Sequence, residues 1–144
     1  MAQSWTLVTG ASGFVGSRLV RALVERGEHV KAFVRAGSSL RHLADLPTDR
    51  CRLAYGDITV EHTVFRALAS CNRLYHVASN FKMWDPDPQT ILRPAIEGTR
   101  ATLEAARRRG IEKIVVTSSV AAMGSTTAAE EMDETHEFNL KDPE

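Results

Sequence analysis

Three glycines at regular spacing mark the place near the N-terminus where a strand gives way to a helix. Residues 5–9 (WTLVT) are typical of a short buried strand, and Gly10, Gly13 and Gly16 follow it directly. Apolar residues then recur at helical spacing to about residue 26. Glycine tolerates backbone conformations and close approaches that other residues do not, so this pattern predicts a tight strand–turn–helix unit.

The alternation of strand and helix continues along the chain. Further strands are predicted at residues 29–34, 51–55, 74–78 and 113–118, and helices at 40–46, 59–70 and from about 90 to 109. This alternation predicts an α/β fold, a doubly wound parallel sheet with strand order 3-2-1-4-5, because crossovers are right-handed. We expect residues 1–124 to form this domain and residues 125–144 to form an acidic, poorly ordered tail.

Composition narrows the class of protein. Of the 144 residues 43% are hydrophobic and 25% charged, the balance of a soluble globular protein. Eighteen basic residues offset eighteen acidic ones, so no net field would attract nucleic acid or an anionic membrane. No signal peptide or membrane helix is recognisable, and we expect a cytoplasmic protein. Cys51 and Cys71 lack metal-type spacing, so we expect reduced thiols and no metal site.

The glycines have a chemical use in such a fold. A ligand binds at the carboxyl ends of the strands where the strand order reverses, between the first and fourth strands. Gly10 would permit the tight turn, Gly13 the approach of a bulky group, and Gly16 close packing of the helix on the sheet. Bare amide N–H groups and the helix dipole then favour a diphosphate. The turn therefore predicts dinucleotide binding; the alternative is a purely structural turn.

The end of the second strand indicates which dinucleotide. NAD-binding chains tend to carry Asp or Glu about 20 residues past the glycines, where it bonds the ribose 2′-hydroxyl. Here that place holds Arg35, followed by Ser38, Ser39 and Arg41. A guanidinium can bind a 2′-phosphate in bidentate fashion, which favours NADP(H) over NAD(H). The alternative is that Arg35 is a solvated surface cation.

Four motifs in matching order carry a family resemblance: TGASGFVG, YGDI, HVAS and VVTSSVAAMG. Together they resemble the extended branch of the short-chain dehydrogenase/reductase superfamily, with its Rossmann-type fold. Within it, the chain is most similar to dihydroflavonol-4-reductase-like proteins and to the NAD-dependent epimerase/dehydratase group. The stretches LRHLADLP and RPAIEGT strengthen the likeness to the reductases. The resemblance extends from Trp5 to about Glu134 and covers the N-terminal part of such an enzyme.

The resemblance implies roles for individual residues. The implied cofactor-binding residues are Thr9, Gly10, Gly13, Phe14, Val15 and Gly16 at the diphosphate, Arg35 and Arg41 at the 2′-phosphate, Asp57 and Ile58 at the adenine, and Val77, Ala78 and Ser79 along the path to the nicotinamide ribose. Ser119 is implied as the catalytic, substrate-orienting hydroxyl. Two alternatives stay open: Asp57 as a turn residue bonding its own backbone, and Ser119 as an ordinary hydroxyl that caps a strand end. His76 is predicted to be a strand-interior histidine rather than a catalyst.

The chain departs from the family at the catalytic pair. Such enzymes use Tyr-x-x-x-Lys, but Thr59 and Ser79 stand four residues after the two tyrosines, Tyr55 and Tyr75. We therefore expect the N-terminal part of an NADP-dependent oxidoreductase of a small molecule, with little turnover by itself. A nucleotide-sugar epimerase or dehydratase and a non-catalytic dinucleotide sensor are the alternatives. We also expect a homo-oligomer formed through the helix at 91–109, whose apolar stripe would be uncovered.

Overall fold

A parallel sheet with helices on both faces forms the body of the protein. The computed structural model describes residues 4–80, 84–127, 131–136 and 138–139. Its elements are β1 (Trp5–Thr9), α1 (Phe14–Glu25), β2 (Val30–Val34), β3 (Cys51–Tyr55), α2 (Glu61–Ala67), β4 (Cys71–His76), α3 (Gln89–Arg109), β5 (Lys113–Val116) and the 3₁₀ helix η1 (Val120–Met123). The strands lie in the order β3-β2-β1-β4-β5, and every neighbouring pair is parallel. The predicted α/β fold and strand order are confirmed.

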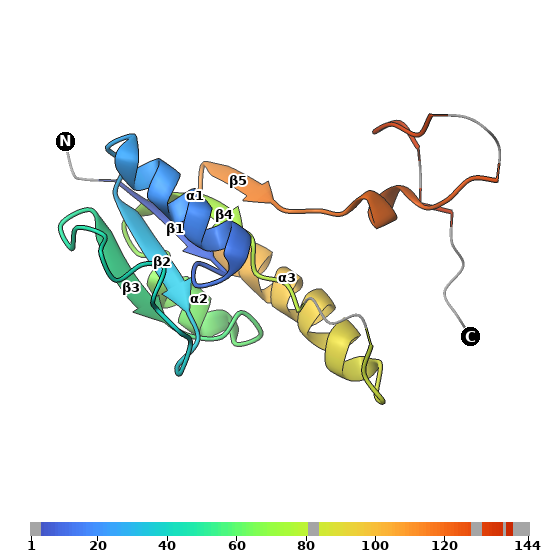
Figure 1. The fold of residues 1–144 in the computed structure, drawn as a ribbon, viewed down its shortest axis with the longest axis horizontal. Helices are drawn as coiled ribbons and strands as arrows, with labels where there is room; N and C mark the ends of the chain where they lie inside the picture. The colour runs from blue at the N-terminus through green and yellow to red at the C-terminus, as the bar shows by residue number, and fades with distance from the viewer. Residues whose placement is uncertain (1–3, 81–83, 128–130, 137, 140–144) are drawn as a thin grey trace.

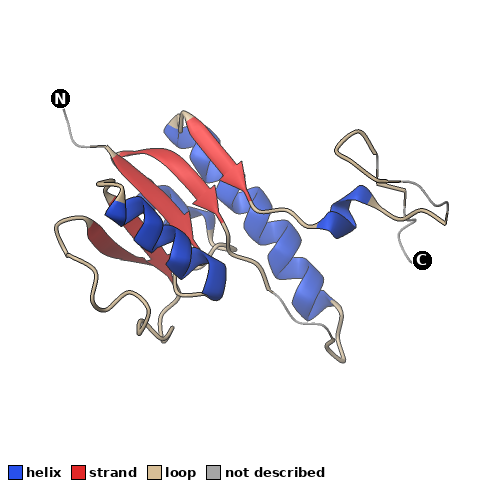
Figure 2. Cartoon of the chain, turned by 45° about the horizontal axis from the view of Figure 1, so that its top comes forward, coloured by secondary structure: helices blue, strands red, loops and turns tan. Residues whose placement is uncertain are grey.

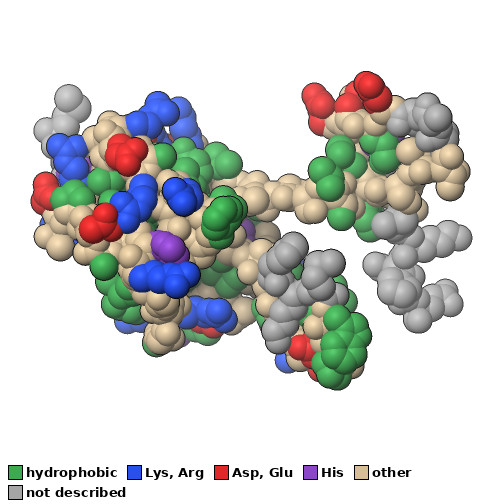
Figure 3. Space-filling model, in the orientation of Figure 1, with side chains coloured by type: hydrophobic (Ala, Val, Ile, Leu, Met, Phe, Trp, Pro, Cys, Tyr) green, Lys and Arg blue, Asp and Glu red, His purple; other side chains and the backbone are tan. Residues whose placement is uncertain are grey.

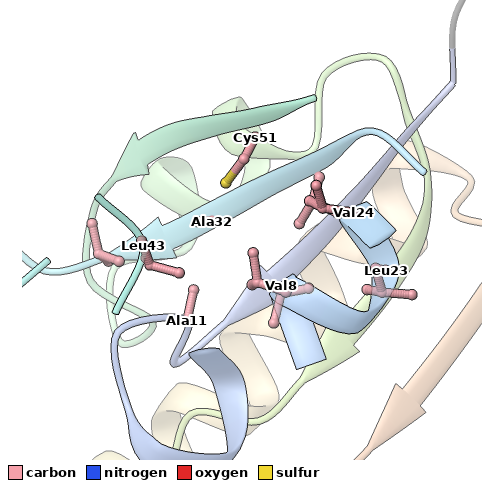
Figure 4. Packing of buried hydrophobic residues seen from close by; sticks show 10 residues of the cluster. Val8, Ala11, Leu23, Val24, Ala32, Leu43 and Cys51 are labelled. Atoms are coloured by element: carbon pink, nitrogen blue, oxygen red, sulfur yellow. The ribbon is translucent and has the colours of Figure 1, made fainter. Parts of the chain in front are cut away.

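The helices divide between the two faces of the sheet, with α1 on one face and α2 and α3 on the other (Figures 1 and 2). Each face has its own apolar cluster because side chains alternate along a strand. Val8 of β1 packs with Val20 and Val24 of α1 (Figure 4), whereas Leu7 packs with Ala105 of α3. All five residues of β1 are buried, so β1 is the centre of the sheet.

Two predicted helices differ from the structure, one in its conformation and one in its length. The predicted helix at 40–46 is a series of turns, in which Leu43 N–H bonds to Leu40 O and Leu46 N–H to Leu43 O. Pro47 follows directly and lacks the N–H that a further turn would use. Helix α2 is shorter than predicted, since the Thr59 hydroxyl donates to Asp57 instead of capping the helix.

Two strand predictions also shift along the chain. Strand β4 occupies residues 71–76 instead of 74–78, and β5 ends at Val116 instead of Ser118. At the end of β4 the N–H groups of Val77 and Ala78 donate to the Thr9 hydroxyl, so the strand ladder stops there.

Helix α3 turns its small residues toward the sheet. Gly98, Thr102, Ala105 and Ala106 are its buried residues, while Leu92 and Ile96 are 48% and 55% exposed. A Cβ on Gly98 would lie 2.6 Å from Ile58 Cδ1, which shows how closely the helix packs. The helix ends at Gly110, whose φ of +66° is the left-handed conformation typical of a helix C-terminus.

The two cysteines lie apart, and both are free thiols. Burial raises the pKa of the Cys71 thiol to about 11 and also raises that of Cys51. Within the described residues, no three or more His, Cys, Asp and Glu side chains are grouped so that they could hold a metal ion.

Beyond β5 the chain leaves the sheet as an extended segment that leads to η1 (Figure 1). In the part that follows, Ser125 N–H donates to Asn139 Oδ1 at 3.0 Å, and Asn139 Nδ2 donates to Ser125 O at 2.6 Å. Basic and acidic side chains are interspersed over the face of the body in Figure 3. Among the helices that the structure describes, none combines the length and hydropathy needed to cross a membrane.

Candidate functional site

The turn between β1 and α1 is built from backbone contacts that exclude side chains. Gly10 has a φ of +67°, and a Cβ there would lie 2.8 Å from Ala78 Cα. Gly13 N–H donates to Gly10 O at 3.0 Å and closes the turn. Gly10 therefore meets both demands that favour glycine, a left-handed backbone and a close approach. The predicted role of Gly10 in the tight turn agrees with this geometry.

The atoms nearest to Gly16 belong to the turn, and its predicted role in packing the helix on the sheet stays a prediction. A Cβ at Gly16 would lie 2.1 Å from Gly10 O and 3.0 Å from Ala11 Cα. Both are backbone atoms of the turn, so the first turn of α1 lies directly on the carbonyl of Gly10. The absence of a side chain at Gly16 lets the helix begin this close to the strand end.

Gly13 differs from the other two glycines because it is exposed. Its φ is −79°, which any residue can adopt, and a Cβ would meet only Gly10 O, at 3.2 Å. It is the N-cap of α1 and makes no side-chain capping bond. The N–H groups of the first helical turn have no intrahelical acceptor. Phe14 and Val15 are 83% and 56% exposed, so this helix end is open to an anion.

Val77 and Ala78 follow β4 and form what we call the β4 exit. They lie against residues 10–13, the glycine turn. Thr9 Oγ1 accepts from Val77 N–H at 3.1 Å and from Ala78 N–H at 3.2 Å. Ala78 in turn supplies the backbone atoms that would collide with a Cβ on Gly10. The structure therefore brings Thr9, Gly10, Val77 and Ala78 together between β1 and β4, where the strand order reverses. Ser79, the next residue of the predicted site, follows Ala78 in the sequence and is exposed.

Arg35 follows β2 at the same end of the sheet. It is exposed, and its carbonyl accepts from Ser38 N–H in a turn where Gly37 has a φ of +79°. The Asp57 carboxylate accepts from the Thr59 hydroxyl at 2.7 Å and from Thr59 N–H at 2.8 Å. These bonds lower the pKa of Asp57, and the nearby Arg35 charge lowers it further. Asp57 is thus a turn residue, the alternative left open above, and it lies within electrostatic reach of Arg35.

Arg21 of α1 binds the loop that carries Arg41, a contact that was not predicted from the sequence. Arg21 donates to Asp45 Oδ2 at 3.0 Å and to the His42 carbonyl at 2.9 Å. Arg41 itself is exposed and its Nε donates to His42 Nε2 at 3.0 Å. An arginine on the polar side of a helix carries no local signal for such a contact, 24 positions away in sequence.

Two further predicted residues make contacts of their own. The side chain of Ile58 packs against Gly98 of α3, so its contact with an adenine stays a prediction. Ser119 is exposed and precedes η1, where its Oγ accepts from Ala121 N–H at 3.2 Å. It therefore caps η1 rather than a strand end, and its hydroxyl proton is not used by that bond, so its catalytic role stays a prediction.

His76, predicted to be a strand-interior histidine, is the last residue of β4 and is 2% exposed. Its Nδ1 lies 2.8 Å from Thr9 Oγ1, and its Nε2 lies 3.3 Å from Thr99 Oγ1 on α3. Burial lowers the pKa of the imidazole. The connection from His76 to Thr9 was not predicted, because the two residues are 67 positions apart.

Residues 7–143 match the 3-beta hydroxysteroid dehydrogenase/isomerase family. The chain belongs to that family. Its members are NAD(P)-dependent oxidoreductases, and the predicted likeness to dihydroflavonol-reductase-like proteins and the epimerase/dehydratase group is confirmed.

Individual relatives of the family give the scale of the similarity. The chain is 43% identical to sterol demethylase protein B of Methylococcus capsulatus over 119 residues. That match covers 83% of this chain and 35% of the other protein. It is 35% identical over 141 residues to dihydroflavonol 4-reductase of Callistephus chinensis, covering 92% and 39%. The crystal structure of UDP-glucose 4-epimerase from Thermus thermophilus in complex with NAD is 27% identical, with a TM-score of 0.78 and coverage of 94% and 44%. The chain thus spans less than half the length of each of these proteins.

Proposed function

We propose that this chain is the dinucleotide-binding part of an NADP-dependent reductase that acts on a carbonyl of a small molecule. The observation that carries the proposal is the open N-terminus of α1 behind Gly13. It presents unpaired N–H groups at the strand-order reversal, the place where such folds bind a diphosphate. The NAD complex of the related epimerase supports a nicotinamide dinucleotide as the ligand.

The preference for NADP(H) is supported by Arg35. A ribose whose 2′-position carries a phosphate would meet the exposed guanidinium at the end of β2, with the Ser38 backbone turned beside it. Charge-assisted bidentate bonds make arginine well suited to phosphate. Arg41 lies on the neighbouring loop that Arg21 holds to α1, and we propose it as a weaker second cation at the phosphate.

The remaining residues have roles along the cofactor. Phe14, Val15 and Gly16 would offer backbone N–H groups to the diphosphate, while Asp57 and Ile58 would border the adenine. Val77, Ala78 and Ser79 would line the path to the nicotinamide, which supplies a hydride when bound. Because the Ser119 Oγ accepts its cap bond, its proton is free to donate to a substrate oxygen.

The likeness to dihydroflavonol 4-reductase supports a reductase. The likeness to UDP-glucose 4-epimerase supports a second candidate, an enzyme that oxidises and re-reduces a nucleotide sugar. Such an enzyme keeps its cofactor through turnover, so nucleotide that stays bound through purification would favour it.

We also propose that the protein forms a homo-oligomer through α3. The exposed side chains of Leu92 and Ile96 lie on this helix, and β5 exposes Ile114, Val115 and Val116. An exposed apolar helix face and an open sheet edge together favour association.

The nucleotide preference can be tested by titrating the protein with NADPH and NADH and following binding by calorimetry. The parent should bind NADPH more tightly, and Arg35→Asp should reverse the order. Loss of a charge-assisted hydrogen bond is worth about 1.5–3 kcal/mol, so NADPH affinity should fall by roughly ten- to a hundredfold.

Arg26→Asp is the matched control, because it makes the same change of charge at the far end of α1. Twelve helical residues separate it from the glycine turn, about 18 Å, which exceeds the Debye length of about 8 Å at physiological salt. It should leave both affinities unchanged. Equal affinities of the parent for the two nucleotides would refute the assignment of Arg35, and binding of neither would refute the proposed function.

A further inference from the structure

Two buried side chains and the half-buried Thr99 connect the sheet with α3, and we call them the Thr9–His76–Thr99 chain. Thr9 is fully buried and His76 is 2% exposed. Thr9 Oγ1 lies 2.8 Å from His76 Nδ1, and His76 Nε2 lies 3.3 Å from Thr99 Oγ1. A buried polar group without partners costs free energy, so the protons of Thr9 and of the His76 ring can be assigned from their neighbours.

The hydroxyl of Thr9 has two acceptor positions and one proton. Val77 N–H and Ala78 N–H approach its oxygen at 3.1 and 3.2 Å, and both can only donate. They occupy the two acceptor positions. The hydroxyl proton therefore points to His76 Nδ1, which must accept it.

An accepting Nδ1 determines the state of the imidazole. The ring is neutral, and its proton is on Nε2, from where it donates to Thr99 Oγ1. The elements packed beside β4 at this level are β1, β5 and α3; they contribute Thr9, the register partner Val116, and Thr99. Among the described residues, no charged side chain is hydrogen-bonded to the ring. Burial lowers the pKa of His76, which agrees with a neutral ring.

We propose that His76 is a positioning residue of the dinucleotide site: by accepting from Thr9 it orients the oxygen that fastens Val77 and Ala78 beside Gly10. The proposal rests on the proposed function for its consequence in binding. The clearance at this point is small, since a Cβ on Gly10 would lie 2.8 Å from Ala78 N and Ala78 Cα. A displacement of the β4 exit therefore changes the glycine turn. If the His76 ring were protonated, its Nδ1–H would point at the Thr9 oxygen, whose two lone pairs already accept from Val77 and Ala78. One of those two hydrogen bonds would then be lost.

The experiment compares the parent with His76→Asn and His76→Leu. Asn can present its amide oxygen near the position of Nδ1, whereas Leu fills the space without an acceptor. Amide hydrogen exchange of Val77 and Ala78 is measured by NMR without nucleotide. In His76→Leu these two amides should exchange about tenfold faster, the effect of losing roughly one hydrogen bond's net free energy. In His76→Asn they should exchange as in the parent, and the Leu74 amide should stay unchanged in all three.

Nucleotide affinity is the second readout. His76→Leu should bind NADPH about tenfold more weakly than the parent, with affinity restored in His76→Asn. Equal exchange of Val77 and Ala78 in all three proteins would overturn the proposal. A parent that binds no dinucleotide would sink the proposed function, yet the exchange rates would still decide whether His76 holds the β4 exit.

The parent alone provides a measurement that does not depend on how the variants fold. The nitrogen chemical shifts of the His76 ring distinguish its two neutral tautomers and the charged form. At pH 7 we expect the tautomer protonated at Nε2. A ring protonated at Nδ1 would overturn the assignment of the Thr9 proton and the proposal with it.

Discussion

Gly16 and Gly13 of the β1–α1 turn should respond differently when each is replaced by alanine: the first should lose stability and the second nucleotide binding. Gly16→Ala puts a Cβ 2.1 Å from Gly10 O, where an ordinary contact begins at about 3.4 Å. The Gly10 carbonyl and the helix must move apart by roughly 1 Å. The atoms that the new Cβ would meet, in Gly10 and Ala11, belong to the backbone and cannot rotate away as a side chain could. Movement of this size disturbs the packing of Val20 and Val24 on the sheet.

The expected cost follows from that geometry. Overpacking a well-packed site costs typically 1–3 kcal/mol, and a backbone clash without relief belongs at the upper end, about 3 kcal/mol. For a domain of this size, 1 kcal/mol corresponds to about 3 °C, so the midpoint of thermal unfolding should fall by about 10 °C. Thermal unfolding followed by circular dichroism measures this directly.

Gly13→Ala is the matched control. Its backbone conformation suits any residue, and its Cβ meets a single atom at 3.2 Å. Replacing an N-cap glycine by alanine costs up to about 1 kcal/mol, so the midpoint should move by no more than about 3 °C. NADPH affinity should nevertheless fall at least about tenfold, because the proposed role of Gly13 is to let the diphosphate approach the backbone without meeting a Cβ. The reasoning is refuted if Gly16→Ala is as stable as Gly13→Ala, or if Gly13→Ala binds NADPH like the parent.

Two other predictions concern pH and assembly. The pKa of His76 is below its unfolded value of about 6.5, so the unfolded chain binds more protons as pH falls below that value. The free energy of unfolding should therefore decrease from about pH 6.5 downward, more steeply in the parent than in His76→Asn; equal slopes in thermal melts would contradict it. The parent should sediment as an oligomer, and Ile96→Glu should shift it toward the monomer. Glu97→Lys changes an exposed residue about 100° around the helix from Ile96 and should leave the oligomer intact. A monomeric parent would contradict the proposed α3 interface.

Much of the scaffold followed from local pattern. The strands at residues 5–9 and 51–55 lie where the runs of apolar and β-forming residues predicted them, and β3-β2-β1-β4-β5 is the expected order. Parallel strands joined by helices leave few topologies, so periodicity alone was enough. The glycine turn was also recognisable, since a left-handed residue such as Gly10 is specified by its own backbone.

Prediction failed where a side chain far away in the sequence competes for a backbone group. Strand β4 ends early because Thr9 takes the N–H groups of Val77 and Ala78, 68 and 69 positions later. In the segment 40–46, where a helix was predicted, the chain forms turns, and Arg21 of α1 donates to the carbonyl of His42. No window of local sequence contains both partners of such a contact.

The amino-acid sequence by itself determined the order of strands and helices and the turn whose open N–H groups suit a diphosphate. It did so because helix and strand periods and glycine's conformational freedom are local properties. Only the tertiary structure decided that His76 faces Thr9, that Gly16 closes on the turn, and which face of α3 is buried. Those contacts depend on how elements pack, and hydrogen-bond directions in a buried site follow from all of its neighbours together.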